Sequence, residues 1–406
     1  MANQAGRRAT VVVVRSDGEV LGCLNPIELS VPWWPETRDL LAALRERFGL
    51  DAVVLRLLAA STPRPEPGAD LTYAVELVGT LPPSLPLEPF DGIALEEDPL
   101  RMPWARPGGV HADVAWADRE LARLGYRRTG PAEQIRSWNL SLLLRMPTSA
   151  GGVWLKHVPP FMRHEAAVIS LLREMGADVP VPLAADTFGR TLLEEVPGED
   201  TYDPDETLTN RMVESLVALQ QRAVPRVGPL LATGCPNWSA ENFLHDIVDL
   251  TTRGDVCAGL NASERASLDR LMAELPLRFE ALHECGLPET LVHGDFHPGN
   301  HRYDGDRLVL LDWGDSGVGH PLLDMTAFLD RVPSGRLGRV TAGWITGWNN
   351  AYPSANVARA TELIRPLGAM RQVLVYQGFL DGIEASERVY HREDPVSWRR
   401  RAIGPS

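Results

Sequence analysis

The sequence predicts an α+β fold, in which a small antiparallel sheet follows a small mixed α/β domain and precedes a larger helical region. Three short apolar stretches separated by turn residues predict hairpin strands within 133–157. Helical spacing dominates after residue 205, and Pro and Gly cluster near residue 100. We therefore divide the chain into a mixed domain (1–100), a linker with a connecting helix (101–130), a sheet with a following hinge (131–198) and a helical region (199–406).

The composition is typical of a cytoplasmic protein. With 44% hydrophobic and 23% charged residues, a chain of 406 residues can bury more than one core. No apolar run is long enough to span a membrane, and the N-terminus lacks the apolar segment of a secretory signal. The four cysteines form no CxxC pair, which indicates reduced thiols. A net charge of −14 disfavours nucleic acid as a partner and slightly favours a cationic ligand. No pattern indicates an oligomeric state.

The first hundred residues predict a hairpin, a helix and two further strands. The hairpin covers 9–24 around an Asp-Gly turn, the helix covers 35–49, and the strands cover 52–60 and 71–79. This order faintly resembles a Nudix hydrolase domain. That family holds metal with a Glu-rich box on the helix, and here only Glu46, Gly49 and Leu50 fit the box. The resemblance therefore implies a module without that catalytic activity.

Lys156 is the only lysine in the chain, beside 39 arginines. It falls in the third predicted strand, in the stretch GGVWLKHV. A site that needs a compact ammonium on a flexible stem would retain a lysine where arginine is otherwise used. A chance survivor on a surface strand explains the same observation, and this residue alone does not decide between the two.

The segment 291–325 concentrates the polar residues that can do chemistry. His293, His297 and His301 are four residues apart, as in helical zinc sites, but the intervening Pro-Gly breaks a helix and disfavours that arrangement. The alternative is phosphoryl transfer. Asp295 follows an apolar strand as a candidate base, and Asn300 and Asp312 have the order and spacing of magnesium ligands.

Phosphoryl transfer also gives Lys156 a function. A kinase needs a strand lysine on the α- and β-phosphates of ATP, and a helix glutamate holds that lysine. Glu165 lies nine residues later, in a helix predicted after Pro159 and Pro160. The order of strand lysine, helix glutamate, base and metal aspartate is more specific than any single match.

Residues of about 130–400 resemble the aminoglycoside phosphotransferase family, a branch of the protein-kinase-like fold with two lobes. The blocks HGDFHPGN at 293–300 and LLDWGDSGVGHPLLD at 310–324 are similar to the two signatures of that family. The resemblance implies ATP and Mg²⁺ as cofactors, Asp295 as the catalytic base, and Asn300 and Asp312 as magnesium ligands. It further implies that Asp324 braces the base loop and that His293 orients it.

The resemblance also implies a nucleotide site. The stretch LEEVPG at 193–198 looks like the hinge between lobes, with Leu193 as gatekeeper and backbone groups near Glu194 and Val196 bound to adenine. The turn SWNLS at 137–141 lacks the glycines of a protein-kinase phosphate loop. Within it, Asn139 and Ser141 are the expected phosphate contacts.

The acceptor is expected to be a small molecule with a hydroxyl group. Only eleven residues separate Asp312 from Asp324, which leaves no room for a peptide platform. An antibiotic-like compound, such as an aminoglycoside or a nucleoside, fits the family, for resistance or for biosynthetic modification. By analogy Asp381, Glu384 and Glu387 would close the acceptor pocket. The acidic run 198–207 either lines a cationic site or is a solvated loop. The alternative function is a catalytically silent, nucleotide-binding scaffold.

Overall fold

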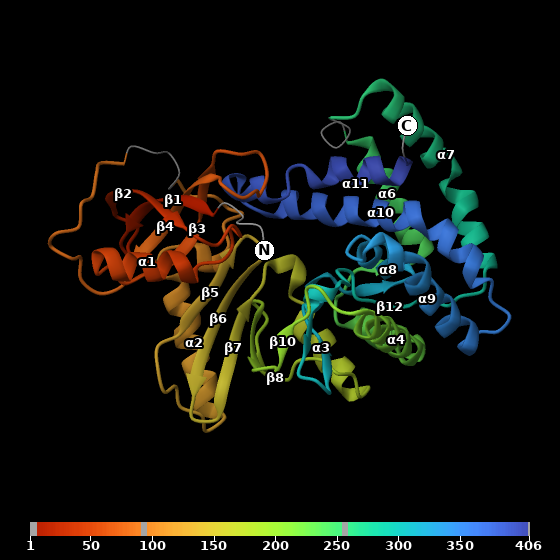
Figure 1. Ribbon diagram of the computed structural model, residues 1–406, viewed down its shortest axis with the longest axis horizontal. Helices are drawn as coiled ribbons and strands as arrows, with labels where there is room; N and C mark the ends of the chain where they lie inside the picture. The colour runs from red at the N-terminus through yellow and green to blue at the C-terminus, as the bar shows by residue number, and fades with distance from the viewer. Residues whose placement is uncertain (1–5, 91–95, 254–258, 405–406) are drawn as a thin grey trace. The chain divides into compact units, whose positions relative to one another are not determined.

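The computed structural model describes residues 6–90, 96–253 and 259–404 (Figure 1). The chain forms two compact units. Unit 1 contains residues 1–163, 182–195 and 379–393, and unit 2 contains 164–181, 196–378 and 394–406. Within the described residues, every helix is too short or too polar to cross a bilayer.

The first sheet of unit 1 confirms the elements predicted for the N-terminal residues. Its strands are β1 (Arg7–Val14), β2 (Val20–Leu29), β3 (Ala52–Ala60) and β4 (Asp70–Leu77), in the order β2-β1-β4-β3. β1 and β2 form the predicted antiparallel hairpin, and β1 pairs with β4 in parallel. Helix α1 (Arg38–Phe48) ends at Gly49, whose φ of 63° is a left-handed conformation that glycine adopts at little cost.

The second sheet of unit 1 carries the single lysine. It contains β5 (Glu133–Trp138), β6 (Ser141–Thr148), β7 (Gly151–His157), β8 (Pro182–Ala185) and β9 (Arg190–Glu194), in the order β5-β6-β7-β9-β8. The three predicted hairpin strands are therefore confirmed. Lys156 lies on the central strand, where it pairs with Leu143 of β6 and Thr191 of β9. Its backbone is thus fixed on both sides.

The two sheets of unit 1 are joined through a buried glutamine. Gln134 of β5 accepts a hydrogen bond from the Val54 N–H at 2.8 Å and donates one to the Val54 carbonyl at 2.7 Å, so it caps both backbone groups of a β3 residue. Ser137 adds a bond to the Leu55 carbonyl at 3.1 Å. The compact units therefore do not follow the sequence boundaries near 100 and 130, because these contacts bind residues 1–100 to the following sheet.

A C-terminal segment completes the core of unit 1. After helix α10 (Val357–Gly382), residues 385–390 form a 3₁₀ helix whose Val389 and Tyr390 are buried in the core of the first sheet. The Tyr390 ring packs edge-on against Trp34 and Trp138, with centroid distances of 5.9 and 5.6 Å. Residues from opposite ends of the sequence thus form one hydrophobic core.

The same segment brings two glutamates into the protein interior. Glu384 is 4% exposed and pairs with Arg101 at 3.0 Å and with Arg56 at 3.4 Å. Glu387 is 1% exposed, and its Oε1 accepts from the Leu57 N–H at 3.4 Å. The prediction that these glutamates close an acceptor pocket is therefore wrong, because each is buried among residues of unit 1. Asp381, on the last turn of α10, is exposed and also belongs to unit 1.

Glu387 is expected to make stability fall as the pH rises. Burial raises its pKa to about 8, and the neighbouring Glu384 adds to the rise, whereas an unfolded glutamate ionises near 4.5. The folded protein binds the proton more tightly, so stability is full below pH 4.5 and decreases up to pH 8. We expect Glu387→Gln to increase the free energy of unfolding by about 4 kcal/mol at pH 8 and to change it little at pH 4. Urea unfolding at the two pH values measures the difference, and an equal effect at both would contradict this assignment.

Unit 2 is mainly helical. Its helices pack around two small sheets, of order β10-β13-β14 and β11-β15-β12. The helices are α3 (Glu165–Glu174), α4 (Glu206–Ala223), α5 (Val227–Ala232), α6 (Ala240–Thr252), α7 (Ala262–Glu284), α8 (Leu323–Leu329), α9 (Leu337–Ala351), most of α10, and α11 (Asp394–Ile403). The strands are β10 (Glu199–Asp200), β11 (Asn237–Trp238), β12 (Thr290–Val292), β13 (His301–Tyr303), β14 (Leu308–Leu310) and β15 (Gly317–Gly319). The predicted helical region after residue 205 is thus confirmed.

Candidate active site

The loop after β12 is held by a buried aspartate. Asp324 is 1% exposed, and its carboxylate accepts from the backbone N–H groups of His293 at 2.9 Å and Gly294 at 2.8 Å. Gln220 of α4 donates a third bond to it at 3.1 Å. The expected bracing by Asp324 is confirmed, and it fixes the backbone directly before Asp295.

His293 connects the base loop to the strand that leads to Asp312. Its Nδ1 accepts from the Asp295 N–H at 3.3 Å, so its Nε2 carries the proton and donates to the Leu311 carbonyl at 2.8 Å. Burial lowers the pKa of His293, which favours this neutral form. The side chain therefore orients the loop, as expected, and its two nitrogens are occupied by that role.

Asp295 presents an ionised carboxylate. Asn300, at the end of a short 3₁₀ turn (Pro298–Asn300), donates Nδ2 to the Asp295 carbonyl at 2.8 Å and to its Oδ2 at 3.1 Å. His297 Nε2 lies 3.4 Å from the same Oδ2. Partial burial opposes ionisation of Asp295, but the hydrogen bonds from His297 and Asn300 lower its pKa to about 2. At neutral pH this carboxylate is therefore ionised, and it can accept a hydrogen bond from a hydroxyl group.

Asp312 sits in a strained backbone conformation. Its φ of 61° makes it the one non-glycine residue with positive φ among the described residues. Such a conformation costs a non-glycine residue about 1–3 kcal/mol and is common at functional sites. Glu165 of α3 stabilises the next residue, because its Oε1 accepts from the Trp313 N–H at 3.0 Å. Glu165, which the sequence pairs with Lys156, thus also holds the turn that carries Asp312.

The oxygen atoms of Asn300 and Asp312 fit a magnesium ion that also binds phosphate. Mg²⁺ is bound through one or two protein oxygen ligands together with phosphates and waters. Because Asn300 donates its Nδ2 to Asp295, its Oδ1 is the atom that can bind a cation. Within residues 6–90, 96–253 and 259–404, no three His, Cys, Asp or Glu side chains gather as a ligand set. The zinc arrangement considered from the sequence would need these histidines on one face of a helix. Instead, His301 Nδ1 lies 3.1 Å from the carbonyl oxygen of His297.

The predicted nucleotide contacts lie in and after the second sheet. Ser141 Oγ accepts from Trp138 Nε1 at 3.1 Å across the β5–β6 turn. Asn139 in that turn is fully buried, and neither polar atom of its side chain has a hydrogen-bond partner among the described residues. Leu193 and Glu194 end β9, and the chain passes from unit 1 to unit 2 between Glu195 and Val196. The nucleotide-binding roles of these residues stay predictions.

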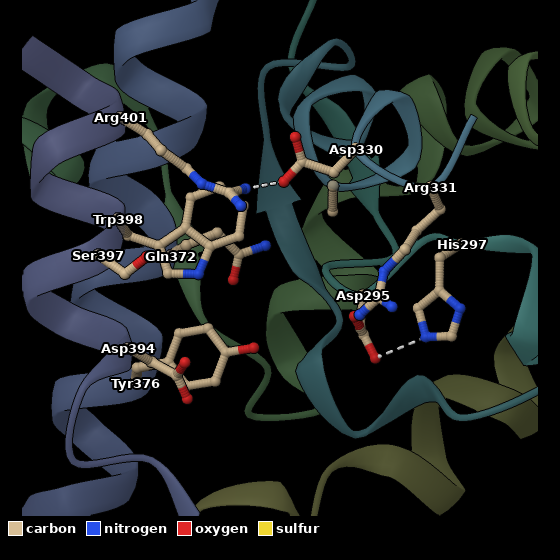
Figure 2. A pocket seen from close by; sticks show the side chains of 11 residues that line it. Asp295, His297, Asp330, Arg331, Gln372, Tyr376, Asp394, Ser397, Trp398 and Arg401 are labelled. Carbon is tan, nitrogen blue, oxygen red and sulfur yellow. Dashed lines mark hydrogen bonds and ion pairs between the residues drawn. The ribbon is translucent and has the colours of Figure 1, made fainter. Parts of the chain in front are cut away.

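A cavity of about 370 Å³ opens beside Asp295 within unit 2 (Figure 2). Its walls come from the base loop, from α8 and the residues after it, and from α10 and α11. The lining residues are Asp295, His297, Ala327, Asp330, Arg331, Gln372, Tyr376, Asp394, Ser397, Trp398 and Arg401. Most of them carry a polar group, and Figure 2 shows the Asp295 carboxylate on the side opposite Tyr376 and Asp394. The cavity thus places a candidate base beside space for a small molecule.

One cation of this cavity already has partners inside it. Arg401 forms an ion pair with Asp330, and its Cζ lies 4.4 Å from the centre of the Trp398 ring. Sequence reasoning missed these residues and Arg331, because no local motif marks them. The only available signal was the helical periodicity of the last fifty residues, which does not indicate which face borders a cavity.

The family model that describes the phosphotransferase enzyme family matches residues 125–358, more than half of the chain. The match begins after the first sheet, so the Nudix resemblance of residues 1–100 is not confirmed. No curated protein matches the chain.

Several solved structures have a similar fold. The macrolide 2'-phosphotransferase from Brachybacterium faecium is 18% identical with a TM-score of 0.50, over 72% of this chain and 98% of that one. A protein described as an aminoglycoside phosphotransferase from Ralstonia eutropha is 16% identical with a TM-score of 0.51, over 72% and 96%. A choline/ethanolamine kinase family protein from Mesorhizobium loti is 16% identical with a TM-score of 0.50, over the same shares. At these identities the likeness shows a common fold.

Proposed function

Because this chain belongs to the phosphotransferase enzyme family, we propose that it transfers the γ-phosphoryl group of ATP to a hydroxyl group of a small molecule bound in the cavity beside Asp295. The observation that carries the proposal is the position of this carboxylate. It is ionised, it is held by Asn300, and it lines a cavity large enough for a small acceptor. We place the reaction in the cytoplasm, where ATP is available.

Asp295 would act on the proton of the acceptor. In phosphoryl transfer, an aspartate at this position accepts or orients the proton of the attacking hydroxyl. Asn300 and His297 keep the carboxylate in one orientation, which maintains the alignment that the transfer needs. Asn300 and Asp312 would hold Mg²⁺, which would neutralise charge on the phosphates of the nucleotide.

The nucleotide would be bound by the residues that the sequence indicates. Lys156 would contact the α- and β-phosphates and pair with Glu165, whose Oε1 also fixes the turn after Asp312. The backbone near Glu194 and Val196 would bind adenine beside Leu193. Asn139 and Ser141 would lie close to the phosphates.

The cavity lining carries charges of both signs, from Asp295, Asp330 and Asp394 and from Arg331 and Arg401. Asp330 is neutralised by Arg401, and Arg401 covers the Trp398 face on which another cation could stack. Arg331 adds a second cation to the lining. Because the carboxylates of the lining outnumber its guanidinium groups, both acceptors expected from the sequence, an aminoglycoside and a nucleoside, fit the cavity. Resistance and biosynthetic modification are both compatible with such an acceptor.

Mass spectrometry with a panel of acceptors tests the function. Purified protein is incubated with Mg-ATP and hydroxylated compounds, including nucleosides, macrolides, aminoglycosides and sugars. A phosphate-sized mass gain on one compound is the expected result. Binding of Mg-ATP without transfer to any member of a broad panel would favour the alternative, a silent scaffold that binds nucleotide.

Lys156→Arg is expected to lose most of the activity although it keeps the charge. A guanidinium is larger and planar, so it cannot reproduce the position of a compact ammonium on the phosphates. We expect kcat/KM for ATP to fall about 100-fold, a typical cost of misplacing a group by about 1 Å. Steady-state kinetics with varied ATP measures the loss. Arg173→Lys, an exchange of the same residue types at an exposed position of α3, is the control. Equal activity of the Lys156 variant and the control would contradict a role in phosphate binding.

A further inference from the structure

The base loop and the turn after Asp312 touch at a glycine. Gly294 has a φ of 92°. A Cβ atom at this position would lie 1.9 Å from the Asp315 carbonyl oxygen and 2.5 Å from Nη2 of Arg371, so no larger residue fits without displacing one of them. Two short segments that carry the proposed base and a proposed metal ligand are therefore packed directly on each other and on one guanidinium.

Arg371 of α10 bonds to both segments at once. It is 1% exposed. Its Nη1 donates to the Gly294 carbonyl at 2.6 Å, and its Nη2 donates to the Asp315 carbonyl at 3.1 Å. The Cζ atom lies 3.9 Å from the centre of the Trp238 ring, so the guanidinium plane is also held from the side by β11. A rigid, planar fork makes these contacts from two separate nitrogens while it lies over an aromatic ring, an arrangement that an ammonium group cannot reproduce.

Nearby carboxylates help to keep the buried guanidinium of Arg371 charged. Burial lowers its pKa, and the carboxylates of Asp315, Asp324 and Asp295 oppose that effect. Asp324 binds the backbone of the same loop through the N–H groups of His293 and Gly294. The loop is thus bound both by a buried carboxylate that accepts from its N–H groups and by a buried guanidinium that donates to its carbonyl.

Protein kinases place an arginine directly before the base aspartate. In this chain Gly294 occupies that position. We propose that Arg371, which is 76 residues after Asp295, is the positioning residue that sets the spacing between the base loop and the Asp312 turn. It does not touch substrate in this proposal, which rests on the roles proposed above for Asp295 and Asp312.

Arg371→Met and Arg371→Lys test the proposal. Methionine fills the space of the stem and removes both donors, whereas lysine keeps the charge and can replace only part of the fork. Arg365, at an exposed position of the same helix, gives the matched controls Arg365→Met and Arg365→Lys. The first measurement is amide hydrogen exchange by mass spectrometry, which needs neither nucleotide nor acceptor.

In Arg371→Met we expect exchange about tenfold faster in both 291–296 and 311–317, with the remaining helices of unit 2 unchanged. Phosphoryl transfer should show kcat lowered about 100-fold, while the Kd for Mg-ATP and the acceptor KM stay within about twofold. Arg371→Lys should recover part of the kcat. If Arg371 only supported the fold, its substitution would instead speed amide exchange throughout unit 2 and lower the unfolding temperature. It would not lower kcat while leaving the acceptor KM unchanged.

Unchanged exchange in both segments, or faster exchange in only one of them, would overturn the proposal. If Arg371→Met does not fold, Arg371→Lys decides: local loosening of both segments supports the proposal, and loosening throughout unit 2 contradicts it. If the wild-type protein transfers phosphate to no acceptor, the proposed function fails, but hydrogen exchange still shows whether Arg371 holds the two segments together.

Discussion

Asp295→Asn is expected to reduce phosphoryl transfer by about 1,000-fold and to leave Mg-ATP binding intact. A positioned base contributes about 10²–10⁴-fold, and the amide cannot accept the proton of the attacking hydroxyl. The substitution is nearly isosteric, so the cavity keeps its shape. Turnover with the identified acceptor and calorimetric titration with Mg-ATP measure the two quantities separately.

The matched control for this prediction is Asp306→Asn, an exposed aspartate in the turn between β13 and β14. It should leave both quantities unchanged. Full transfer by Asp295→Asn would show that another group takes the proton, and the assignment of the base would be abandoned. Loss of Mg-ATP binding together with transfer would instead indicate a role in holding the metal and its nucleotide.

Glu384→Ala is expected to lower the free energy of unfolding by about 3–5 kcal/mol, because removal of one partner leaves buried charge without compensation. Arg56 and Arg101 are 1% and 7% exposed, and both pair with this glutamate. Glu393→Ala is the control from the same segment. Its pair with Arg64 is at the surface, with 65% and 48% of the two side chains exposed, so its loss should cost less than about 1 kcal/mol. Urea unfolding of the two variants gives both values.

The same variants test the correction made from the structure. If Glu384 closed the acceptor pocket, as the sequence suggested by analogy, Glu384→Ala would raise the acceptor KM and leave stability nearly unchanged. We expect the opposite pattern, with a lower free energy of unfolding and an unchanged KM in the fraction that remains folded.

The candidate base was predictable because its chemistry is encoded locally. Asp295, Asn300 and Asp312 lie within eighteen residues, so their order and spacing are visible in the sequence. The strands that carry Lys156 were predictable for a similar reason, since turn residues separate adjacent antiparallel strands. Asp324 also lies close to the loop that it braces.

The remaining parts depend on contacts between distant segments. The cavity wall formed by Tyr376 and Trp398 lies about eighty to a hundred residues from Asp295 along the chain. Periodicity predicts the helices that carry these residues, but it does not specify which face borders the base. Glu384 was misplaced for the same reason. An acidic residue near the C-terminus has no local signature that distinguishes a ligand pocket from a buried ion pair.

The burial of Val389 and Tyr390 in the core of the first sheet has a consequence for synthesis on the ribosome. The sheet itself is translated by residue 77, but its core is incomplete until residue 390 has emerged from the exit tunnel. At about 5–20 residues per second, this takes roughly 15–60 s more. During that time the apolar side chains that later contact Tyr390 have no native partner. This part of the first sheet is therefore the part of the nascent chain that is most prone to aggregate or to bind chaperones. Truncation before residue 389 would make this transient state permanent.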